Sequence, residues 1–145
     1  MLTEREEIIA KIKEKLHNSS FNVKCGLEIE KVECGKMTLA MKVADDMTNP
    51  YGMAHGGALA TLMDTCVGVT CLTLGKNVVT LNMTTNYLKS APQGCTVRAT
   101  SNIIHNGRTT VVGEVTVVDD AGNLIAKASA TFFVIKHDPD IPAQW

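Results

Sequence analysis

The sequence predicts an α+β protein in which an antiparallel β-sheet wraps around one long central helix. Strand-like segments occupy most of the chain, and a single apolar segment near its middle is long enough for a buried helix. Helices and strands do not alternate as they do in β-α-β proteins. Because 145 residues suffice for only one core, we expect one domain over residues 1–145, with an N-terminal helix within 1–18 and a C-terminal tail at 137–145.

The N-terminal part of the chain is expected to hold a helix followed by a hairpin. Residues 3–17 repeat apolar side chains at helical spacing, and Thr3 and Glu6 have the spacing of a capping box. Residues 24–32 and 36–43 have the pattern of two strands with a short turn between them.

The central helix is preceded by a loop. Residues 45–57 are rich in Gly, Pro, Asn and Asp, which are typical of turns. The helix should run from about residue 57 to residue 74 and end at Gly75. It is apolar on nearly every face, so we expect other elements to enclose it.

Further strands are predicted after this helix, at 78–88, 96–104, 109–118 and 124–135. The turn-forming residues 119–123 predict a hairpin between the last two. Apolar and polar side chains alternate along the final strand, so one face of the sheet is buried. Pro139 and Pro142 predict a tail that leaves the domain.

Charge and cysteine content exclude several classes of protein. The chain has 14 Lys and Arg against 15 Asp and Glu, so no basic excess is present to bind nucleic acid. The five cysteines form no C-x-x-C pair, which argues against a disulfide framework or a zinc site. Residues 1–16 lack the apolar core of a signal peptide, and the apolar segment 58–74 contains a charge and several threonines. We expect a cytoplasmic protein with reduced thiols and no nucleic-acid or membrane partner.

Asp64 is the only formally charged residue of the predicted central helix. A carboxylate in an apolar setting costs several kcal/mol unless it is hydrogen-bonded, protonated or open to a ligand. One explanation is structural, namely a hydrogen bond to the backbone, to Thr61 or to Thr65. The other is functional, namely a ligand pocket that opens onto the carboxylate.

His55-Gly56-Gly57 occupies the expected start of this helix. Backbone N–H groups there lack partners within the helix, and the helix dipole is positive at this end. Glycines let a substrate approach these groups, which can polarise a carbonyl and stabilise the negative charge that develops in acyl transfer. Alternatively, the two glycines only begin a helix in a tight space.

The spacing of Gly57 and Asp64 predicts a site shared between subunits. Seven helical residues separate the two by about 10 Å along the axis. An oxyanion donor and a nucleophile or base must both lie about 3 Å from the reacting carbonyl. Two antiparallel helices in a symmetric dimer would bring each carboxylate beside the start of the other helix. We therefore predict paired active sites at a subunit interface.

One segment carries a family resemblance: Asn49-Pro50-x-Gly52-x-x-His55-Gly56-Gly57-x-Leu59-x-x-Leu62-x-Asp64. It resembles the active-site segment of hotdog-fold acyl-CoA thioesterases, and the nearest branch is the phenylacetyl-CoA and 4-hydroxybenzoyl-CoA thioesterase-like group. The similarity in element order extends from about residue 20 to residue 136. It implies a hotdog fold and a homodimer with a continuous sheet, which usually pairs into a homotetramer.

The resemblance also implies roles for individual residues. Asp64 would act as nucleophile or as the general base for water, and the N–H of Gly56 would bind the thioester oxygen. Asn49 would orient water or substrate, and Gly57 would contact the substrate. His55 would shape the site, unless it is only a loop histidine near a helix end.

Thr80 and Arg108 are weaker matches to the family. A hydroxyl on the strand after the helix assists the water in related enzymes; Thr80 is the nearest match and Thr84 the next, although strand threonines also serve packing. The turn that contains Arg108 resembles the region that meets the CoA nucleotide. Arg108 would then contact a phosphate, unless it is simply an exposed turn residue.

The predicted reaction is hydrolysis of an acyl-CoA thioester without a metal or bound cofactor, because CoA enters as part of the substrate. No G-x-S-x-G, H-E-x-x-H or P-loop pattern indicates another hydrolase chemistry. Cys66 lies on a different helix face from Asp64 and is expected in the core. Two alternatives remain open. One is a noncatalytic acyl-CoA-binding or regulatory module, and the other is an acyl-thioester dehydratase or hydratase. Both aryl and fatty acyl groups are compatible with the sequence.

Overall fold

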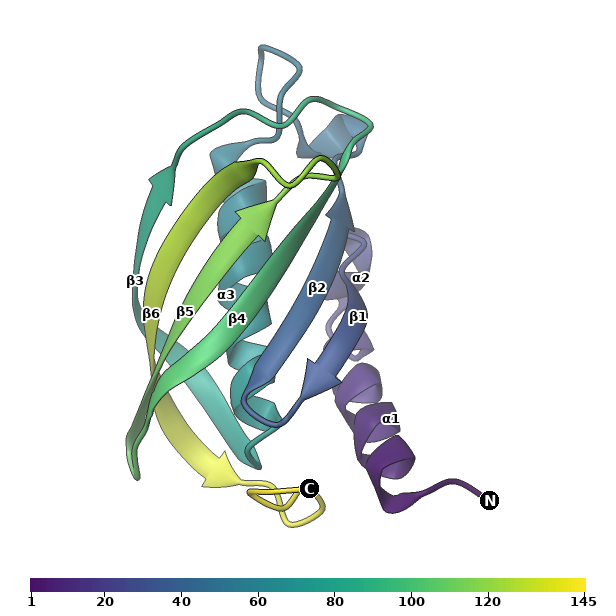
Figure 1. Ribbon diagram of the computed structural model, residues 1–145, viewed down its shortest axis with the longest axis vertical. Helices are drawn as coiled ribbons and strands as arrows, with labels where there is room; N and C mark the ends of the chain where they lie inside the picture. The colour runs from purple at the N-terminus through teal and green to yellow at the C-terminus, as the bar shows by residue number, and fades with distance from the viewer.

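The computed structural model describes residues 1–145 as one six-stranded antiparallel sheet that curves around a long helix (Figure 1). This arrangement confirms the α+β class and the central helix. The elements, in chain order, are α1 (Glu4–His17), α2 (Ser20–Lys24), β1 (Glu28–Glu33), β2 (Lys36–Lys42), a 3-10 turn (Asp45–Met47), α3 (Gly56–Leu72), β3 (Lys76–Tyr87), β4 (Thr96–Asn106), β5 (Thr110–Val118) and β6 (Leu124–His137).

Local sequence signals explain the first helices. The Thr3 hydroxyl accepts a hydrogen bond from the Glu6 N–H at 3.2 Å, and the Glu6 carboxylate accepts one from the Thr3 N–H at 2.8 Å, so the predicted capping box is present. The first strand begins later than predicted, because residues 20–24 form α2 behind a Ser19 cap. Gly26, with a φ of 68°, then turns the chain toward β1.

The strands lie in the order β1-β2-β4-β5-β6-β3, and every neighbouring pair is antiparallel. The strand β3, which directly follows α3, therefore lies at one edge of the sheet, and β1 lies at the other. Along β6, Ala126, Ala128, Ala130 and Phe132 are all buried, as the predicted alternation requires.

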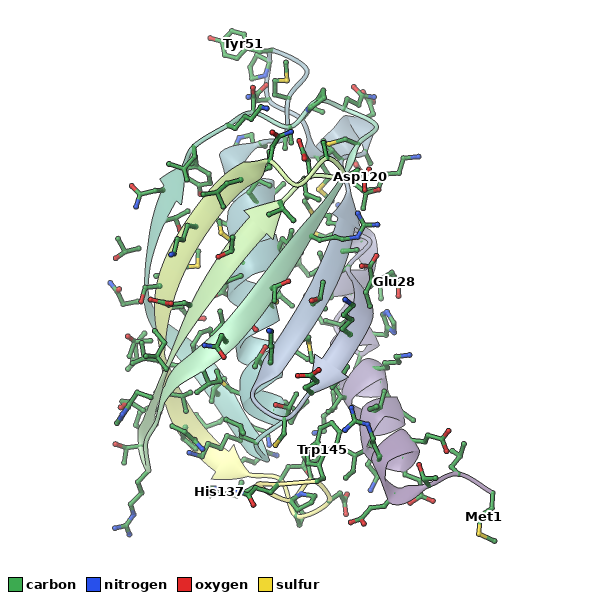
Figure 2. The ribbon with its side chains drawn as sticks, viewed as in Figure 1. Met1, Glu28, Tyr51, Asp120, His137 and Trp145 are labelled. Atoms are coloured by element: carbon green, nitrogen blue, oxygen red, sulfur yellow. The ribbon has the colours of Figure 1, made fainter.

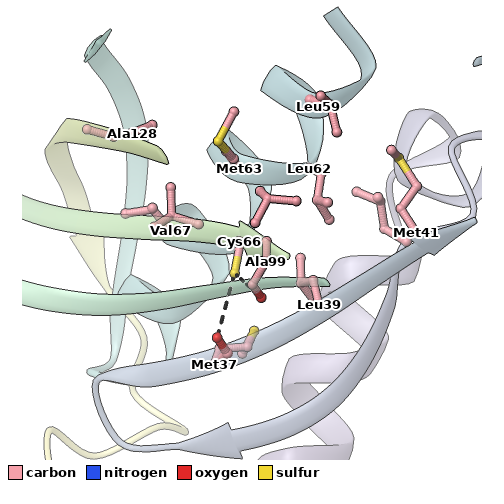
Figure 3. Close-up of a cluster of buried hydrophobic side chains, with 14 of the residues drawn as sticks. Met37, Leu39, Met41, Leu59, Leu62, Met63, Cys66, Val67, Ala99 and Ala128 are labelled. Atoms are coloured by element: carbon pink, nitrogen blue, oxygen red, sulfur yellow. Dashed lines mark hydrogen bonds between the residues drawn. The ribbon is translucent and has the colours of Figure 1, made fainter. Parts of the chain in front are cut away.

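The core between α3 and the sheet is apolar (Figure 3). Leu62, Met63 and Cys66 of α3 are fully buried in one cluster with Leu39 and Ala99. The Cys66 thiol donates to the Ala99 carbonyl at 3.4 Å, and burial raises the pKa of this thiol to about 11. Cys66 is therefore a core residue, as predicted. All five cysteines are unpaired.

Within a single chain, one face of the helix α3 is not covered by other elements. Its buried residues face the sheet, whereas Gly57, Thr61, Asp64 and Gly68 lie along the opposite face and are exposed or half-buried. The expectation of complete enclosure is thus wrong for one chain. No helix combines the length and apolar content that a membrane crossing requires.

The C-terminal tail packs onto the domain, contrary to the prediction that it leaves. Ile141 is 2% exposed, and the Trp145 indole N–H donates to the Thr73 carbonyl at 2.8 Å, at the C-terminal end of α3. The Asp138 carboxylate pairs with the Lys15 ammonium of α1 at 2.9 Å. Figure 2 shows Trp145 beside α1. Burial of apolar side chains such as Ile141 holds the tail against the domain despite its two prolines.

Candidate active site

The start of α3 presents one satisfied and one free backbone N–H. His55 is the N-cap residue, and its Nδ1 accepts a hydrogen bond from the Gly57 N–H at 2.8 Å. The Gly56 N–H makes no hydrogen bond within the chain. The N–H that the family resemblance assigns to the thioester oxygen is therefore free, whereas that of Gly57 is occupied by the cap.

Different constraints act on a side chain at Gly56 and at Gly57. A methyl group at Gly57 would lie 3.0 Å from the His55 Nδ1, so the capping histidine restricts this position. At Gly56 the nearest atom would be a Tyr87 ring carbon at 3.5 Å, an ordinary contact distance, and the φ of Gly56 is not positive. Neither packing nor backbone conformation within the chain requires a glycine at position 56. Close approach of a ligand to its N–H gives a reason for one.

Asn49 organises the loop before the helix. Its Oδ1 accepts hydrogen bonds from the N–H groups of Tyr51 at 2.9 Å and Met53 at 3.1 Å. The amide nitrogen of its side chain makes no hydrogen bond within the chain, so Asn49 can still donate to a ligand.

Asn49 and Gly56 line the same pocket, which has a volume of about 470 Å³ and also contains Leu59 of α3 and Tyr87 and Leu88 from the end of β3. A second pocket, of about 410 Å³, lies on the α2 side of the helix start and is lined by Gly57. Since the free N–H belongs to Gly56, the first pocket is the candidate site.

Asp64 is half-buried on the open face of α3. The Thr80 hydroxyl donates to the Asp64 Oδ1 at 2.7 Å. The predicted structural partners do not bind Asp64, because Thr61 donates to the Gly57 carbonyl at 2.9 Å and Thr65 makes no side-chain hydrogen bond. The carboxylate is therefore held through one oxygen, and its second oxygen has no partner in the chain.

The predicted site residues do not all meet within one chain. Asp64 lies eight residues beyond Gly56, about 12 Å along the helix axis. Arg108 is exposed in the β4–β5 turn. That turn is bonded to Lys76, just beyond the C-terminal end of α3, through the Gly107 carbonyl at 2.6 Å. Arg108 and Gly56 thus lie at opposite ends of α3, and a single chain does not bring all of the predicted site residues together.

Tyr87 has no local signal in the sequence that marks it as a site residue. The ring of Tyr87 packs against Gly56, and its hydroxyl donates to the Gly56 carbonyl at 3.0 Å. A bulge between Thr80 and Asn82 shifts the alternation of β3, so the residues that face α3 change from even to odd numbers. A regular count from Thr80 would place Tyr87 on the outer face of the sheet.

Comparison with known proteins identifies the family. Residues 51–126 match the family model described as the Thioesterase superfamily. This chain belongs to the thioesterase superfamily. The putative esterase ComA2 of Bacillus subtilis (strain 168) is 32% identical over 115 residues, which are 77% of this thioesterase and 90% of ComA2. Acyl-coenzyme A thioesterase 13 of Homo sapiens is 32% identical over 100 residues, which are 67% of this chain and 71% of the human protein.

A solved structure agrees in fold. A hypothetical thioesterase from Streptococcus pneumoniae TIGR4, crystallised with coenzyme A, is 33% identical, has a TM-score of 0.81, and covers 86% of this chain and 98% of its own. Alanine variants of one aspartate and of one threonine of that protein have also been solved, and the two positions are separated by the same number of residues as Asp64 and Thr80. The hotdog fold is confirmed, and this chain is a thioester hydrolase of the superfamily.

Proposed function

We propose that the protein hydrolyses acyl-CoA thioesters in paired sites between two subunits of a symmetric homodimer. In each site the Gly56 N–H of one subunit binds the thioester oxygen, and Asp64 of the partner subunit supplies the carboxylate. One observation carries this proposal: a free N–H and a free carboxylate oxygen lie two turns apart on one helix, too far apart to act on one carbonyl.

The open face of α3 suits a second, antiparallel copy of the helix. A two-fold axis midway between Gly56 and Asp64 would pass near Ala60, and the neighbouring Gly57 and Thr61 are small enough for close approach. In this arrangement Asp64 of one subunit lies level with Gly56 of the other.

The edge strand β3 favours the same arrangement. It is 12 residues long, and its Val79 and Leu81 are 49% and 59% exposed. A long edge strand that carries no charge beyond its first residue and exposes apolar side chains is a template for pairing with another strand. Antiparallel pairing of two β3 strands would continue the sheet and set the two α3 helices side by side. Two such dimers would make the homotetramer that is usual in the family.

The side chains present fit hydrolysis without a metal or cofactor. The Gly56 N–H and the helix dipole stabilise the oxyanion that forms at the carbonyl. Asp64 either attacks the carbonyl carbon and expels the CoA thiolate, which gives an anhydride that water then hydrolyses to restore the carboxylate, or it removes a proton from a water that itself forms the new C–O bond. The C–S bond breaks, the thiolate takes up a proton, and the products are the free acid and CoA.

Other predicted site residues have supporting roles in this proposal. Thr80 orients the Asp64 carboxylate, and Asn49 orients water or substrate through its free amide nitrogen. His55 shapes the site by capping the helix at Gly57. Arg108 of the partner subunit approaches the helix start in an antiparallel dimer, where it would bind a phosphate of CoA.

Mixed dimers test the shared site. Gly56→Pro removes the N–H from the first helical position, where proline is favoured, and His55 already has the extended conformation that suits a residue before proline. Asp64→Ala removes the carboxylate. Each variant alone should be inactive, whereas a heterodimer should recover activity, because one of its sites contains both groups.

Thiol release, followed on heterodimers that are purified through two different affinity tags, measures this recovery. Gly56→Ala keeps the N–H and adds only a methyl group, so it measures how much of the loss in the proline variant comes from crowding of the ligand and how much from the missing N–H. Verified heterodimers without activity would contradict a shared site. Incorporation of heavy oxygen from water into the Asp64 side chain during a single turnover would distinguish the anhydride route from direct attack by water.

A further inference from the structure

We propose that Tyr87 is a positioning and specificity-determining residue of this site, a role that rests on the proposed function. Its hydroxyl holds the first turn of α3, which carries the oxyanion donor. Its ring forms the wall against which the acyl group packs, and it favours acyl groups that have a planar ring near the carbonyl.

The hydroxyl of Tyr87 joins the end of β3 to the start of α3. It donates to the carbonyl of Gly56, the first residue of the helix, at 3.0 Å. A carbonyl oxygen has two lone pairs, so this bond can add to the hydrogen bonds of the helix. Oxyanion stabilisation depends on donors that are already oriented before the reaction, so a bond that fixes this turn affects the rate of the chemical step.

The ring of Tyr87 lies beside the free N–H. It is 3.5 Å from the position that a Cβ of Gly56 would occupy, and it faces α3 because Tyr87 pairs with the buried Ala126 of β6. Nevertheless Tyr87 is 52% exposed. An aromatic ring with an open face next to an oxyanion donor offers contact area to whatever group is attached to the bound carbonyl.

That group is the acyl group. With the thioester oxygen at Gly56, the nucleotide of CoA is held away from Tyr87 by the length of the pantetheine arm. The chain has only two tyrosines, and Tyr51 lines the same pocket from the loop before α3. Tyr51 is 84% exposed and stands at the outer tip of that loop, well away from the body of the sheet (Figure 2). Tyr87 is therefore the ring that meets the acyl group, and aromatic pairs favour offset or edge-to-face contact.

Two substitutions separate the functions of the hydroxyl and the ring. Tyr87→Phe keeps the ring, so we expect a kcat about tenfold lower for phenylacetyl-CoA and hexanoyl-CoA alike, because one orienting hydrogen bond is lost. Tyr87→Leu loses the ring as well, so the ratio of kcat/KM for phenylacetyl-CoA to that for hexanoyl-CoA should fall about 2- to 12-fold. The two substrates share one CoA, so contacts to the nucleotide cancel in this ratio.

The control is Phe133→Leu. It likewise replaces an aromatic ring by leucine, but on the outer face of the sheet, where Phe133 is 42% exposed. It should change neither kcat nor the ratio. A Tyr87→Phe enzyme with unaltered kcat, or a Tyr87→Leu enzyme with an unaltered ratio, would overturn the corresponding part of the proposal. Asp64→Asn is assayed in parallel. If it retains full activity, the proposed function fails, whereas its inactivity together with neutral Tyr87 variants would reject only the role of Tyr87.

Discussion

The two sides of α3 are built differently. On the closed side, defined by α1, β1 and the C-terminal tail, Ile12 and Leu16 are 0% and 1% exposed and Trp145 bonds the end of the helix. On the open side, defined by β3 and the exposed face of α3, Asp64 is half-buried and Leu81 is 59% exposed. Burial is therefore concentrated on the closed side, while the groups that we propose to carry the chemistry lie where burial is incomplete.

The edges of the sheet show the same contrast. The closed-side edge, β1, has 6 residues, carries Glu28, Glu30, Lys31 and Glu33, and contains a bulge near Lys31. Charges on a short edge strand oppose pairing with other chains, and because β3 also contains a bulge, it is length and charge that distinguish the two edges. The open-side edge, β3, has 12 residues and no charged side chain beyond Lys76 at its start. A second subunit is therefore expected at β3 and not at β1.

The largest effect should follow from substitutions that prevent β3 from pairing with a second subunit. Val79→Lys combined with Leu81→Lys places two charges on β3 without disturbing the core, because both side chains are exposed. We expect the proposed dimer to dissociate and activity to disappear, since each proposed site needs two subunits. Light scattering gives the mass and thiol release gives the activity.

Leu124→Lys is the control, because it replaces a leucine that is 41% exposed at the start of β6. This variant should keep the oligomeric state and the activity of the wild type. A doubly substituted β3 variant that is monomeric but fully active would show that one chain contains a complete site.

Asp64→Asn should lower kcat by about 10²- to 10⁴-fold, the usual contribution of a general base or nucleophile. The amide keeps the size of the carboxylate and can still accept the Thr80 hydrogen bond, so the melting temperature should change little. Steady-state thiol release and a thermal melt on the same sample measure both quantities. Loss of activity that is accompanied by unfolding would indicate a structural role for Asp64 instead.

Local signals in the sequence predicted much of the fold. The capping box of α1 and the turn between β5 and β6 involve residues within a few positions of each other, so spacing alone identifies them. The path of the tail was predicted wrongly because it depends on a hydrogen bond between Trp145 and Thr73, 72 residues earlier. Prolines indicate that the chain turns, but the direction of the C-terminal tail depends on the burial of Ile141 against the domain.

The candidate site likewise contains residues that local sequence predicts and residues that only tertiary contacts bring in. Asn49, Gly56 and Asp64 lie within one continuous segment, so their motif and spacing predict them together. The contact of Thr80 with Asp64 requires β3 to cross the helix, and Tyr87 reaches Gly56 only because a bulge changes the alternation of β3. Such contacts follow from tertiary structure, which a count along one strand does not contain.

On the closed side, Ile12→Ala should affect stability and leave the chemistry intact. Ile12 is 0% exposed, so its truncation leaves a cavity in the core and should cost about 2–5 kcal/mol of unfolding free energy. Urea unfolding measures this loss, and kcat at a temperature where the variant is folded should match that of the wild type. A large fall in kcat in the folded variant would show that the two sides are coupled.

The smallest effect is expected at the ion pair between the tail and α1. The Lys15 ammonium at 2.9 Å and the Asp140 N–H hold the pKa of Asp138 below its usual value of 3.8. The unfolded chain thus binds this proton at higher pH than the folded chain. The resulting stability is fully present above the unfolded pKa and is lost as the pH falls through the folded pKa.

Asp138→Asn keeps the size of the side chain but cannot carry its charge. We expect the variant to be less stable at pH 7 by under about 1 kcal/mol, because Lys15 is partly exposed and screened by solvent. The difference should shrink as the pH falls below about 3.8. Urea unfolding across this pH range measures it, with Asp140→Asn as the control, since Asp140 is 67% exposed and lies 3.9 Å from Lys11. A difference that stays constant with pH would mean that Asp138 stabilises the tail through its shape and hydrogen bonds, and that charge contributes nothing to the closure of this side of α3.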